Sequence, residues 1–344
     1  MKGKAFGKPW KVWRNFYKRK QNIENRTMKE IYPPVKFYAI NEIYKRYSGF
    51  PLQLPLPVHV QHGWTIIVYE LDAQQHASEN WYWSRWLESK YKEQFKNITT
   101  RAIGSPFLYL LKLIDYRELP ISQRQGSIVF PCHSTGLIQV DCDYEEYAFR
   151  LEQLPDKYKP ITICMYYVDL EKGADKPFRQ RGFSIVTNGS RESNSLGKQS
   201  FLENFIENTK NKLYAFSNQL GSALLFSNAM GLTSYYFGPE INIDTSRSRF
   251  YKNINIDKVL LEWEEQFAEY FNFPNCDKSK QRIIVNRELG LDCMLSPSEM
   301  NKILWRSTLN QNYTKKVLKQ FKSSTKQRSR QLAGKIKRKI LSSP

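Results

Sequence analysis

The most constraining stretch of this sequence is the segment 212–240, because its pattern predicts one strand–helix–strand unit. Residues 213–216 form a short apolar run typical of a buried strand, and apolar residues then recur at helical spacing over 220–230. Gly231 follows the expected helix, and residues 233–237 form a second strand-like run. This order requires a parallel sheet, because parallel strands need a long crossover connection between them.

The first turn of this unit carries polar groups that suit a phosphate. Ser217, Asn218, Gly221 and Ser222 supply hydroxyls, an amide and free backbone N–H groups at the start of the expected helix. A helix N-terminus attracts anions, because its first N–H groups have no partner within the helix and carry partial positive charge. The same pattern also fits an ordinary capped helix in an α/β core, so both interpretations stay open at this point.

The preceding residues repeat the alternation of strands and helices. Further buried strands are expected at 127–130, 161–168 and 183–187, with helices at 144–154, 172–180 and 199–209. Together with the unit above they predict a doubly wound parallel sheet of five strands, which binds ligands outside the carboxyl ends of its strands. The polar residues at or just beyond those ends are His133, Ser134, Thr135, Asp169, Ser190, Arg191, Ser217, Asn218 and Ser222.

The first part of the chain predicts a second, smaller α/β domain. Strands are expected at 58–61 and 65–71, a charged helix at 79–96, and a further helix that begins at Ser105-Pro106. Residues 253–310 have the apolar spacing of helices. The expected divisions are a basic aromatic segment 1–30, an α/β domain 31–120, a second α/β domain 121–295 and a basic amphipathic tail 296–344.

His62 is the candidate for proton transfer in the first domain. It follows the strand expected at 58–61 and precedes Gly63, which lets a ligand approach the backbone. A histidine can take a proton from a sugar hydroxyl near neutral pH. The alternative is a structural histidine bonded to a loop carbonyl.

The formal net charge of +20 is concentrated at the two ends of the chain. Residues 1–30 carry +8 and residues 310–344 carry +11, which leaves a nearly neutral middle. Such ends attract an anionic membrane surface or nucleic acid, and the aromatic and aliphatic residues among the charges favour the membrane. A solvated basic helix and a frayed basic tail are the simpler alternatives.

Cysteines and metal motifs add little specific chemistry. Five cysteines without a CxxC pair are typical of reduced thiols in an intracellular protein, and no apolar stretch is long enough to span a bilayer. Asp141 and Asp143 have the spacing of a Mg²⁺-binding pair, but their place before an expected helix favours an N-cap role for Asp143. No GxGxxG, P-loop or HExxH motif occurs, so neither a metal nor a cofactor is expected.

At residues 104–109, 130–134 and 217–222 the chain resembles GT-B-type glycosyltransferases of bacterial capsule and lipopolysaccharide synthesis, and among these it is most similar to sialyltransferase-like enzymes. The resemblance covers roughly residues 55–240. It implies two Rossmann-like domains that face each other across a cleft. The acceptor sugar would lie mainly on the first domain and the nucleotide-sugar mainly on the second, without a conserved metal.

The resemblance also implies roles for individual residues. His133, with Ser134 and Thr135, matches a His/Ser loop near the donor phosphate, and the turn at 217–222 matches a Ser-rich phosphate-binding turn. His62 would face these loops as the base. The acidic Asp/Glu-Asp-Gly motif of several sialyltransferase-like groups is not found in the first domain, where Glu70 and Asp72 are the nearest acids after His62.

We therefore expect a metal-independent, inverting glycosyltransferase in the cytoplasm, held at the inner membrane face by its basic ends. Its partners would be a nucleotide-sugar and a glycan or lipid-linked acceptor, rather than nucleic acid. Three alternatives remain open at this stage. The chain could be a nucleotide-sugar epimerase of the same fold, an inactive transferase, or a non-catalytic basic protein that binds membranes or nucleic acid.

Overall fold

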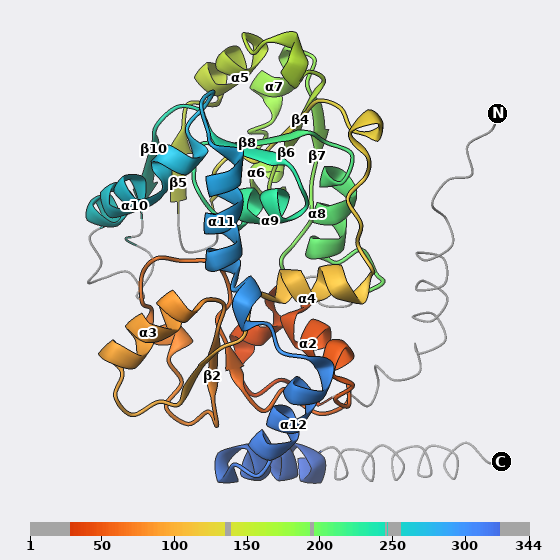
Figure 1. Ribbon diagram of the computed structural model, residues 1–344, viewed down its shortest axis with the longest axis vertical. Coiled ribbons are helices and arrows are strands. Elements are labelled where there is room, and N and C mark those ends of the chain that lie inside the picture. The colour runs from red at the N-terminus through yellow and green to blue at the C-terminus, as the bar shows by residue number, and fades with distance from the viewer. Residues whose placement is uncertain (1–27, 135–138, 193–195, 245, 247–255, 324–344) are drawn as a thin grey trace, which may run out of the picture.

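A computed structural model describes residues 28–134, 139–192, 196–244, 246 and 256–323. It shows an α/β chain with two parallel sheets, which confirms the expected fold class at that level. Figure 1 shows a small-sheet half, coloured red to orange, below a large-sheet half, coloured mainly green. Most of the expected segment 1–30 and the end of the tail 296–344 lie outside the described residues.

The large sheet contains the five strands that the sequence predicts, each parallel to its neighbours. They are β4 (Ser127–Val129), β6 (Ile161–Cys164), β7 (Ser184–Val186), β8 (Tyr214–Ser217) and β9 (Thr233–Tyr236). Their order in space is β7-β6-β4-β8-β9, so the direction of winding reverses between β4 and β8. The predicted doubly wound sheet is therefore confirmed, and the reversal is the place where such sheets bind ligands.

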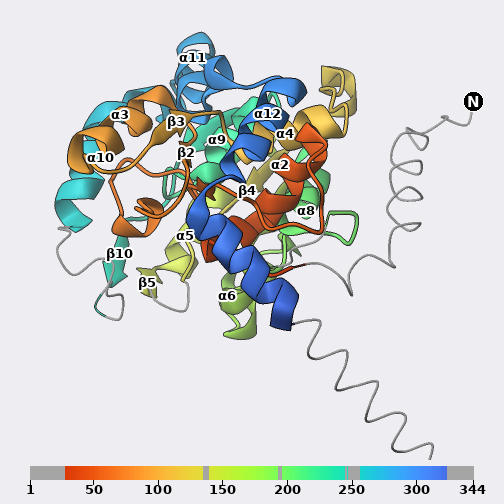
Figure 2. The ribbon, with the colours of Figure 1, turned by 90° about the horizontal axis from the view of Figure 1, so that it is seen from below.

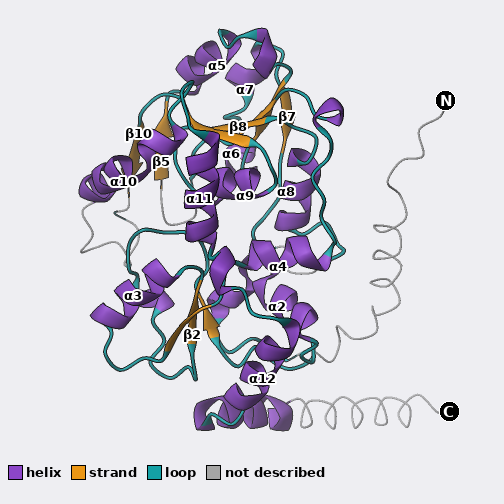
Figure 3. Cartoon of the chain, viewed as in Figure 1, coloured by secondary structure: helices purple, strands orange, loops and turns teal. Residues whose placement is uncertain are grey.

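Helices cover both faces of the large sheet, as Figure 3 shows. On one face, α5 (Tyr144–Glu152) and α7 (Lys176–Gln180) bury Tyr147 and Phe178 against Val129 and Phe216. On the other face, α8 (Phe201–Thr209) and α9 (Ser222–Ala229) pack within the main core. The strand expected at 161–168 is wrong in its second half, since it ends at Cys164 and is followed by the short helix α6 (Tyr167–Glu171). The helix expected at 172–180 is present only as α7.

The small sheet has three parallel strands in the order β1-β2-β3. Its elements are β1 (His59–Val60), β2 (Asn80–Tyr82), β3 (Thr100–Ala102), and the helices α2 (Ile40–Ser48), α3 (Arg85–Gln94) and α4 (Pro106–Leu113). The strand expected at 58–61 and the helix that begins at Ser105-Pro106 are confirmed.

Two predictions for the small-sheet half are wrong. Residues 65–71 form no strand, since the Thr65 hydroxyl bonds the backbone of Ile67 in a local turn. The helix expected at 79–96 begins only at Arg85, and residues 80–82 form the fully buried central strand. Ser84 separates the two elements, because its hydroxyl accepts the Leu87 N–H as the N-cap.

The C-terminal helices connect the two halves, and helices over 253–310 are thereby confirmed. After α10 (Ile256–Phe271), α11 (Lys278–Leu289) packs on α9 of the large-sheet half, and α12 (Pro297–Ser307) packs on α2 of the small-sheet half. Figure 2 shows α12 and the helical residues 311–323 that follow it on the outer side of the small-sheet half. A two-stranded antiparallel ribbon, β5 (Gln139–Cys142) with β10 (Ile241–Asp244), lies beside the large sheet.

The halves share one apolar core. The Phe107 ring of α4 stacks on Phe226 of α9 at a centroid distance of 4.1 Å, and the Trp83 ring lies 5.9 Å from the same phenylalanine. The backbones also meet, since Leu289 O accepts the Ser105 N–H at 2.8 Å. The relative position of the two halves is therefore set by close packing.

Gly290 offers a test of this close contact, and Gly290→Ala should lower the free energy of unfolding by at least about 2 kcal/mol. The residue has a φ of +68°, and an added Cβ would lie 1.8 Å from Trp83 O. Left-handed backbone costs about 1–2 kcal/mol, and the clash adds to it. Gly182→Ala is the control, because its φ is +77° with nothing within 4 Å of the added Cβ. Urea denaturation measures both free energies of unfolding. An equal loss of stability in Gly290→Ala and Gly182→Ala would contradict a close contact at Gly290.

Candidate functional site

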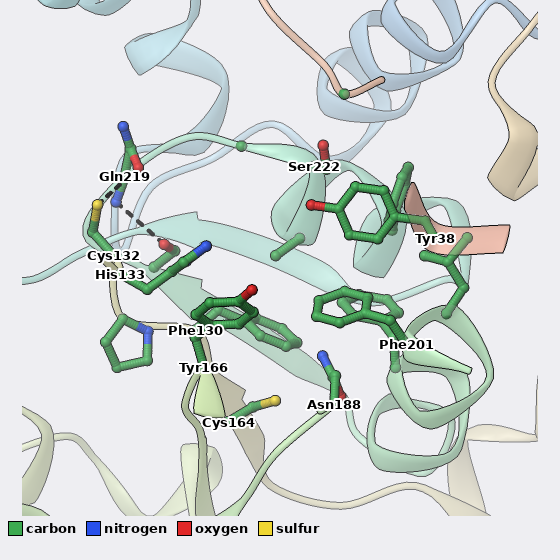
Figure 4. A pocket seen from close by; sticks show the side chains of 18 of the residues that line it. Tyr38, Phe130, Cys132, His133, Cys164, Tyr166, Asn188, Phe201, Gln219 and Ser222 are labelled. Atoms are coloured by element: carbon green, nitrogen blue, oxygen red, sulfur yellow. Dashed lines mark hydrogen bonds between the residues drawn. The ribbon is translucent and has the colours of Figure 1, made fainter. Parts of the chain in front are cut away.

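A pocket with a cavity volume of about 180 Å³ lies between the two halves, beyond the carboxyl ends of β4 and β8. The large-sheet half contributes the loops after its strands, and the small-sheet half contributes Tyr38, Gly63, Trp83 and Pro106. Most of the lining is aromatic or aliphatic, with a few polar groups around it (Figure 4). A pocket of this kind at the reversal point of a parallel sheet is the expected place for a ligand.

His133 follows β4 and lies on the pocket wall. Its ring packs against Tyr166 at a centroid distance of 4.7 Å and remains accessible to solvent from the pocket. Enclosure by the surrounding protein and the nearby positive charge of Arg191 lower the pKa of His133. The imidazole is therefore neutral at pH 7 and can both donate and accept a hydrogen bond.

The turn between β8 and α9 forms the opposite part of the wall. Ser217, Gly221 and Ser222 line the pocket, and the first turn of α9 contains no acidic residue. Nothing lies within 4 Å of a Cβ placed on Gly221, so open space adjoins the helix N-terminus. Three residues of the predicted phosphate-binding turn therefore lie where an anion could reach them.

Other predicted site residues are used within the protein. The Asn218 amide accepts the Cys132 N–H at 2.8 Å and donates to Pro239 O, so it joins the loops after β4 and β8. Ser134 is buried and accepts the Val140 N–H, and Asp169 is buried against Ser134. Thr135 lies outside the described residues. Of the expected helix caps, Asp143 is confirmed, since its carboxylate accepts the Glu146 N–H at 2.9 Å.

Arg191 brings a positive charge close to this site, although it is not among the residues that line the pocket. Its guanidinium lies over the Phe37 ring at 4.6 Å, and among the described residues it forms no salt bridge. Burial is the main influence on the pKa of His62, His133, Tyr38 and Tyr166, but the Arg191 charge lowers all four. Arg191 is thus within electrostatic reach of side chains from both halves. The neighbouring Ser190 hydroxyl accepts the Glu192 N–H and does not line the pocket.

The backbone that opposes Arg191 is strained. Tyr38 and Ala39 have φ values of +59° and +58°, in the left-handed region that non-glycine residues rarely adopt. The Tyr38 N–H donates to Arg191 O at 2.8 Å, and the Tyr38 ring packs on Phe201 at 5.1 Å and lines the pocket. Strained backbone of this kind clusters at ligand sites, and here it directs an aromatic ring into the pocket.

His62 lies on the loop after β1, next to the pocket-lining Gly63. Its Nδ1 is 3.0 Å from one oxygen of Asp72 and 3.2 Å from the other, and Asp72 is fully buried. Burial lowers the pKa of His62, but the charge and hydrogen bond of Asp72 outweigh burial and raise it overall. Since Nδ1 faces the carboxylate, Nε2 is the nitrogen left to act as a base.

The His62 loop also contacts the helix N-terminus of the large-sheet half. The Trp64 N–H donates to the Ser222 hydroxyl at 3.3 Å, and the Trp64 indole donates to buried Glu288 of α11 at 3.0 Å. The predicted base and the predicted phosphate-binding turn are therefore neighbours in space.

The sequence did not identify Asp72, Tyr38 or Tyr166 as site residues. Asp72 is ten positions from His62 along an irregular loop, so no motif spacing indicates the pair. Tyr38 enters the pocket only because of the left-handed turn at 38–39. Tyr166 stands just beyond β6, and the sequence did not indicate it because the strand was expected to continue to residue 168.

Within the described ranges, no three His, Cys, Asp or Glu side chains gather as a metal-binding group, and metal independence stays a prediction. None of the helices in those ranges combines the length and apolar character needed to cross a bilayer. The cysteines at 132, 142, 164, 276 and 293 form no disulfide. No family model, no curated protein and no solved structure matches this chain.

Proposed function

We propose that this chain is a glycosyltransferase of the GT-B type, with its two halves as Rossmann-like domains. It transfers a sugar from a nucleotide-sugar to a growing surface glycan or a lipid-linked acceptor. Two observations carry the proposal. The Arg191 guanidinium forms no salt bridge among the described residues, and the His62–Asp72 pair of the other half lies within electrostatic reach of its charge. An anionic leaving group and a proton acceptor are the two needs of this reaction, and the site has a group for each.

The donor phosphate would lie between Arg191, His133 and the start of α9. Arg191 supplies a fixed positive charge, and a neutral His133 supplies a ring N–H. The backbone N–H groups at Gly221 and Ser222 supply further donors that need no reorganisation during the reaction. The aromatic part of the pocket, with Tyr166 and Phe130, suits the flat apolar faces of a nucleobase or sugar ring.

The proton would move to His62. Its Nε2 takes the proton of the acceptor hydroxyl, and that oxygen forms a bond to the anomeric carbon. The bond from this carbon to the phosphate oxygen breaks, and the nucleotide leaves with the electron pair and its negative charge against Arg191. Asp72 stabilises the imidazolium that forms, as a buried carboxylate does in other base dyads. Base and leaving group on opposite sides of the sugar predict inversion.

The experiment that tests this function is a thermal-shift screen with UDP-, GDP- and CMP-sugars. A donor at 100 times its dissociation constant adds about 2.7 kcal/mol to stability, which gives a shift of a few °C. Nucleotide release with an acceptor present supports transfer, whereas conversion of the sugar without an acceptor supports the epimerase. Absence of any nucleotide effect, with and without residues 1–30 and 310–344, would contradict both and favour the non-catalytic basic protein.

The acceptor side suggests contact with an anionic membrane. Four large apolar side chains are 46–80% exposed on and after α12, namely Trp305, Leu309, Leu318 and Phe321. Lys315, Lys319 and Lys322 alternate with them, and seven further cations follow after residue 323 in the sequence. This combination suits the headgroup layer of an anionic membrane, where each cation contributes about 1 kcal/mol to the free energy of binding.

We expect the chain to sediment with vesicles that contain phosphatidylserine and not with phosphatidylcholine vesicles. Leu318→Ser with Phe321→Ser should weaken this binding at least about tenfold, since two large apolar groups are lost from the interface. Phe149→Ser on α5 is the matched control, because Phe149 is 50% exposed in the large-sheet half. Binding that is equal on both kinds of vesicle, or absent, would contradict the membrane partner.

A further inference from the structure

A second histidine lies behind the His62–Asp72 pair. His59 belongs to β1, where it pairs with Asn80 of the central strand, and its side chain is fully buried. Its Nε2 lies 3.6 Å from Asp72 Oδ1, slightly beyond hydrogen-bond length. Neither ring nitrogen of His59 has a hydrogen-bond partner among the described residues. A buried histidine with no hydrogen bond is costly, so its place beside Asp72 calls for a reason.

The environment of Asp72 supplies that reason. The carboxylate is fully buried, and among the described residues only His62 and His59 lie within ion-pair distance of it. Burial raises the pKa of Asp72, but the two histidines outweigh it and hold the pKa well below its usual range. Asp72 therefore stays charged, and two imidazole rings share the task of compensating one buried negative charge.

We propose that His59 is a positioning residue, which competes with His62 for the Asp72 carboxylate and so weakens the hold of Asp72 on the protonated form of His62. A base in a transferase must be neutral before it can accept a proton. A carboxylate that served His62 alone would keep His62 protonated to higher pH. When His59 and His62 share the carboxylate, Asp72 still orients the His62 ring. A larger fraction of His62 is then neutral and able to accept a proton.

Other groups around the two histidines do not replace this effect. His62 also faces the Arg191 charge, which lowers its pKa, and the rings of Phe37 and Tyr69 at 6.5 and 6.4 Å. The Tyr82 hydroxyl donates to the Asp72 backbone carbonyl at 2.8 Å, and so it does not compete with the histidines for the Asp72 carboxylate. His59 packs edge-on against the Tyr32 ring at 5.8 Å.

The test measures protons on His62 by NMR, and this chain is well suited to it because it has only four histidines. His59→Phe keeps a buried ring but removes the donor, so the titration midpoint of His62 should rise by about one pH unit, a tenfold change in proton affinity. His59→Gln keeps an N–H donor and should leave the midpoint near that of the unchanged protein. In an Asp72→Asn background, His59→Phe should no longer shift it, because the shared charge is absent.

Two results would overturn the inference. One is a His62 midpoint that stays unchanged in His59→Phe, and the other is an equal shift with and without the Asp72 charge. Should His59→Phe fail to fold, ¹⁵N shifts of the unchanged protein decide, since we expect His59 protonated at Nε2 and His62 at Nδ1. A His59 with its Nε2 unprotonated would also overturn it. The inference rests on the proposed function only in calling His62 the base, and these readouts need no activity, so either idea can fail alone.

Discussion

Replacing His62 by alanine is expected to lower turnover about 10²–10⁴-fold, while the affinity for the nucleotide-sugar changes less than about threefold. The reason is geometric, since His62 comes from the small-sheet half, whereas Arg191 and the α9 N-terminus belong to the large-sheet half. Donor binding then survives without the base. His76→Ala is the matched control, because His76 lies exposed on the same irregular loop and should leave both quantities unchanged.

The pH dependence of the rate provides a second reading of the same residue. Because Asp72 raises the pKa of His62 above 6.5, kcat/KM should rise as the pH increases through that raised value. Asp72→Asn removes the charge, so kcat/KM should rise at lower pH than in the unchanged protein. Its maximum value should also be lower, because the His62 ring loses the carboxylate that orients it. Equal losses of turnover and donor affinity in His62→Ala would instead show that His62 is structural.

Replacing Arg191 by glutamine is expected to weaken nucleotide-sugar binding about 10–150-fold, the equivalent of about 1.5–3 kcal/mol for a hydrogen bond to a charged group. Within the described residues Arg191 has no carboxylate partner to lose, so the change should act on the ligand and not on the fold. Arg191→Lys keeps the charge but loses the planar fork over Phe37, and it should recover only part of the affinity. Isothermal titration with the best donor of the thermal screen measures both.

Arg150→Gln is the matched control for this prediction. Arg150 lies on α5, where it pairs with Glu146 on the surface of the large-sheet half, and it does not line the pocket. Its replacement should leave donor affinity unchanged. An Arg191→Gln variant that binds the donor as tightly as the unchanged protein would remove Arg191 from the site.

The large sheet could be predicted from the sequence because its strands are short apolar runs separated by turns and amphipathic helices. The small sheet was harder. Its strands have two or three residues, and Trp81 and Tyr82 of β2 precede a charged helix without a glycine or proline to mark the boundary. The isolated pattern at 79–96 therefore resembles one helix, and only pairing with β1 and β3 makes residues 80–82 a strand.

The site could be predicted in outline only. The topology rule placed the loops after β4, β7 and β8 at one edge of the sheet. His133, Gly221 and Ser222 do line one pocket, and Arg191 lies within electrostatic reach of His133. The rule does not say which polar side chains face a ligand. Asn218 joins two loops and Asp169 is buried against Ser134, which depends on contacts between residues far apart in the sequence.

The pairing of His62 with Asp72 is a second contact that could not be predicted from the sequence. The sequence predicted His62 as the base of the first domain, where the acidic motif implied by the resemblance is not found. In the structure the acid stands behind a histidine, which is brought to it by the irregular loop between β1 and β2. Such a pair needs no fixed spacing between its two residues in the sequence, because loops of different length can bring the acid back to the histidine at the end of β1.

The most direct measurement is a co-crystal structure with the nucleotide-sugar that gives the largest thermal shift. The account predicts the phosphate within hydrogen-bond distance of Arg191 and the α9 N-terminus, with the anomeric carbon of the sugar directed toward Nε2 of His62. A nucleotide-sugar bound elsewhere, or a phosphate turned away from Arg191, would contradict the account.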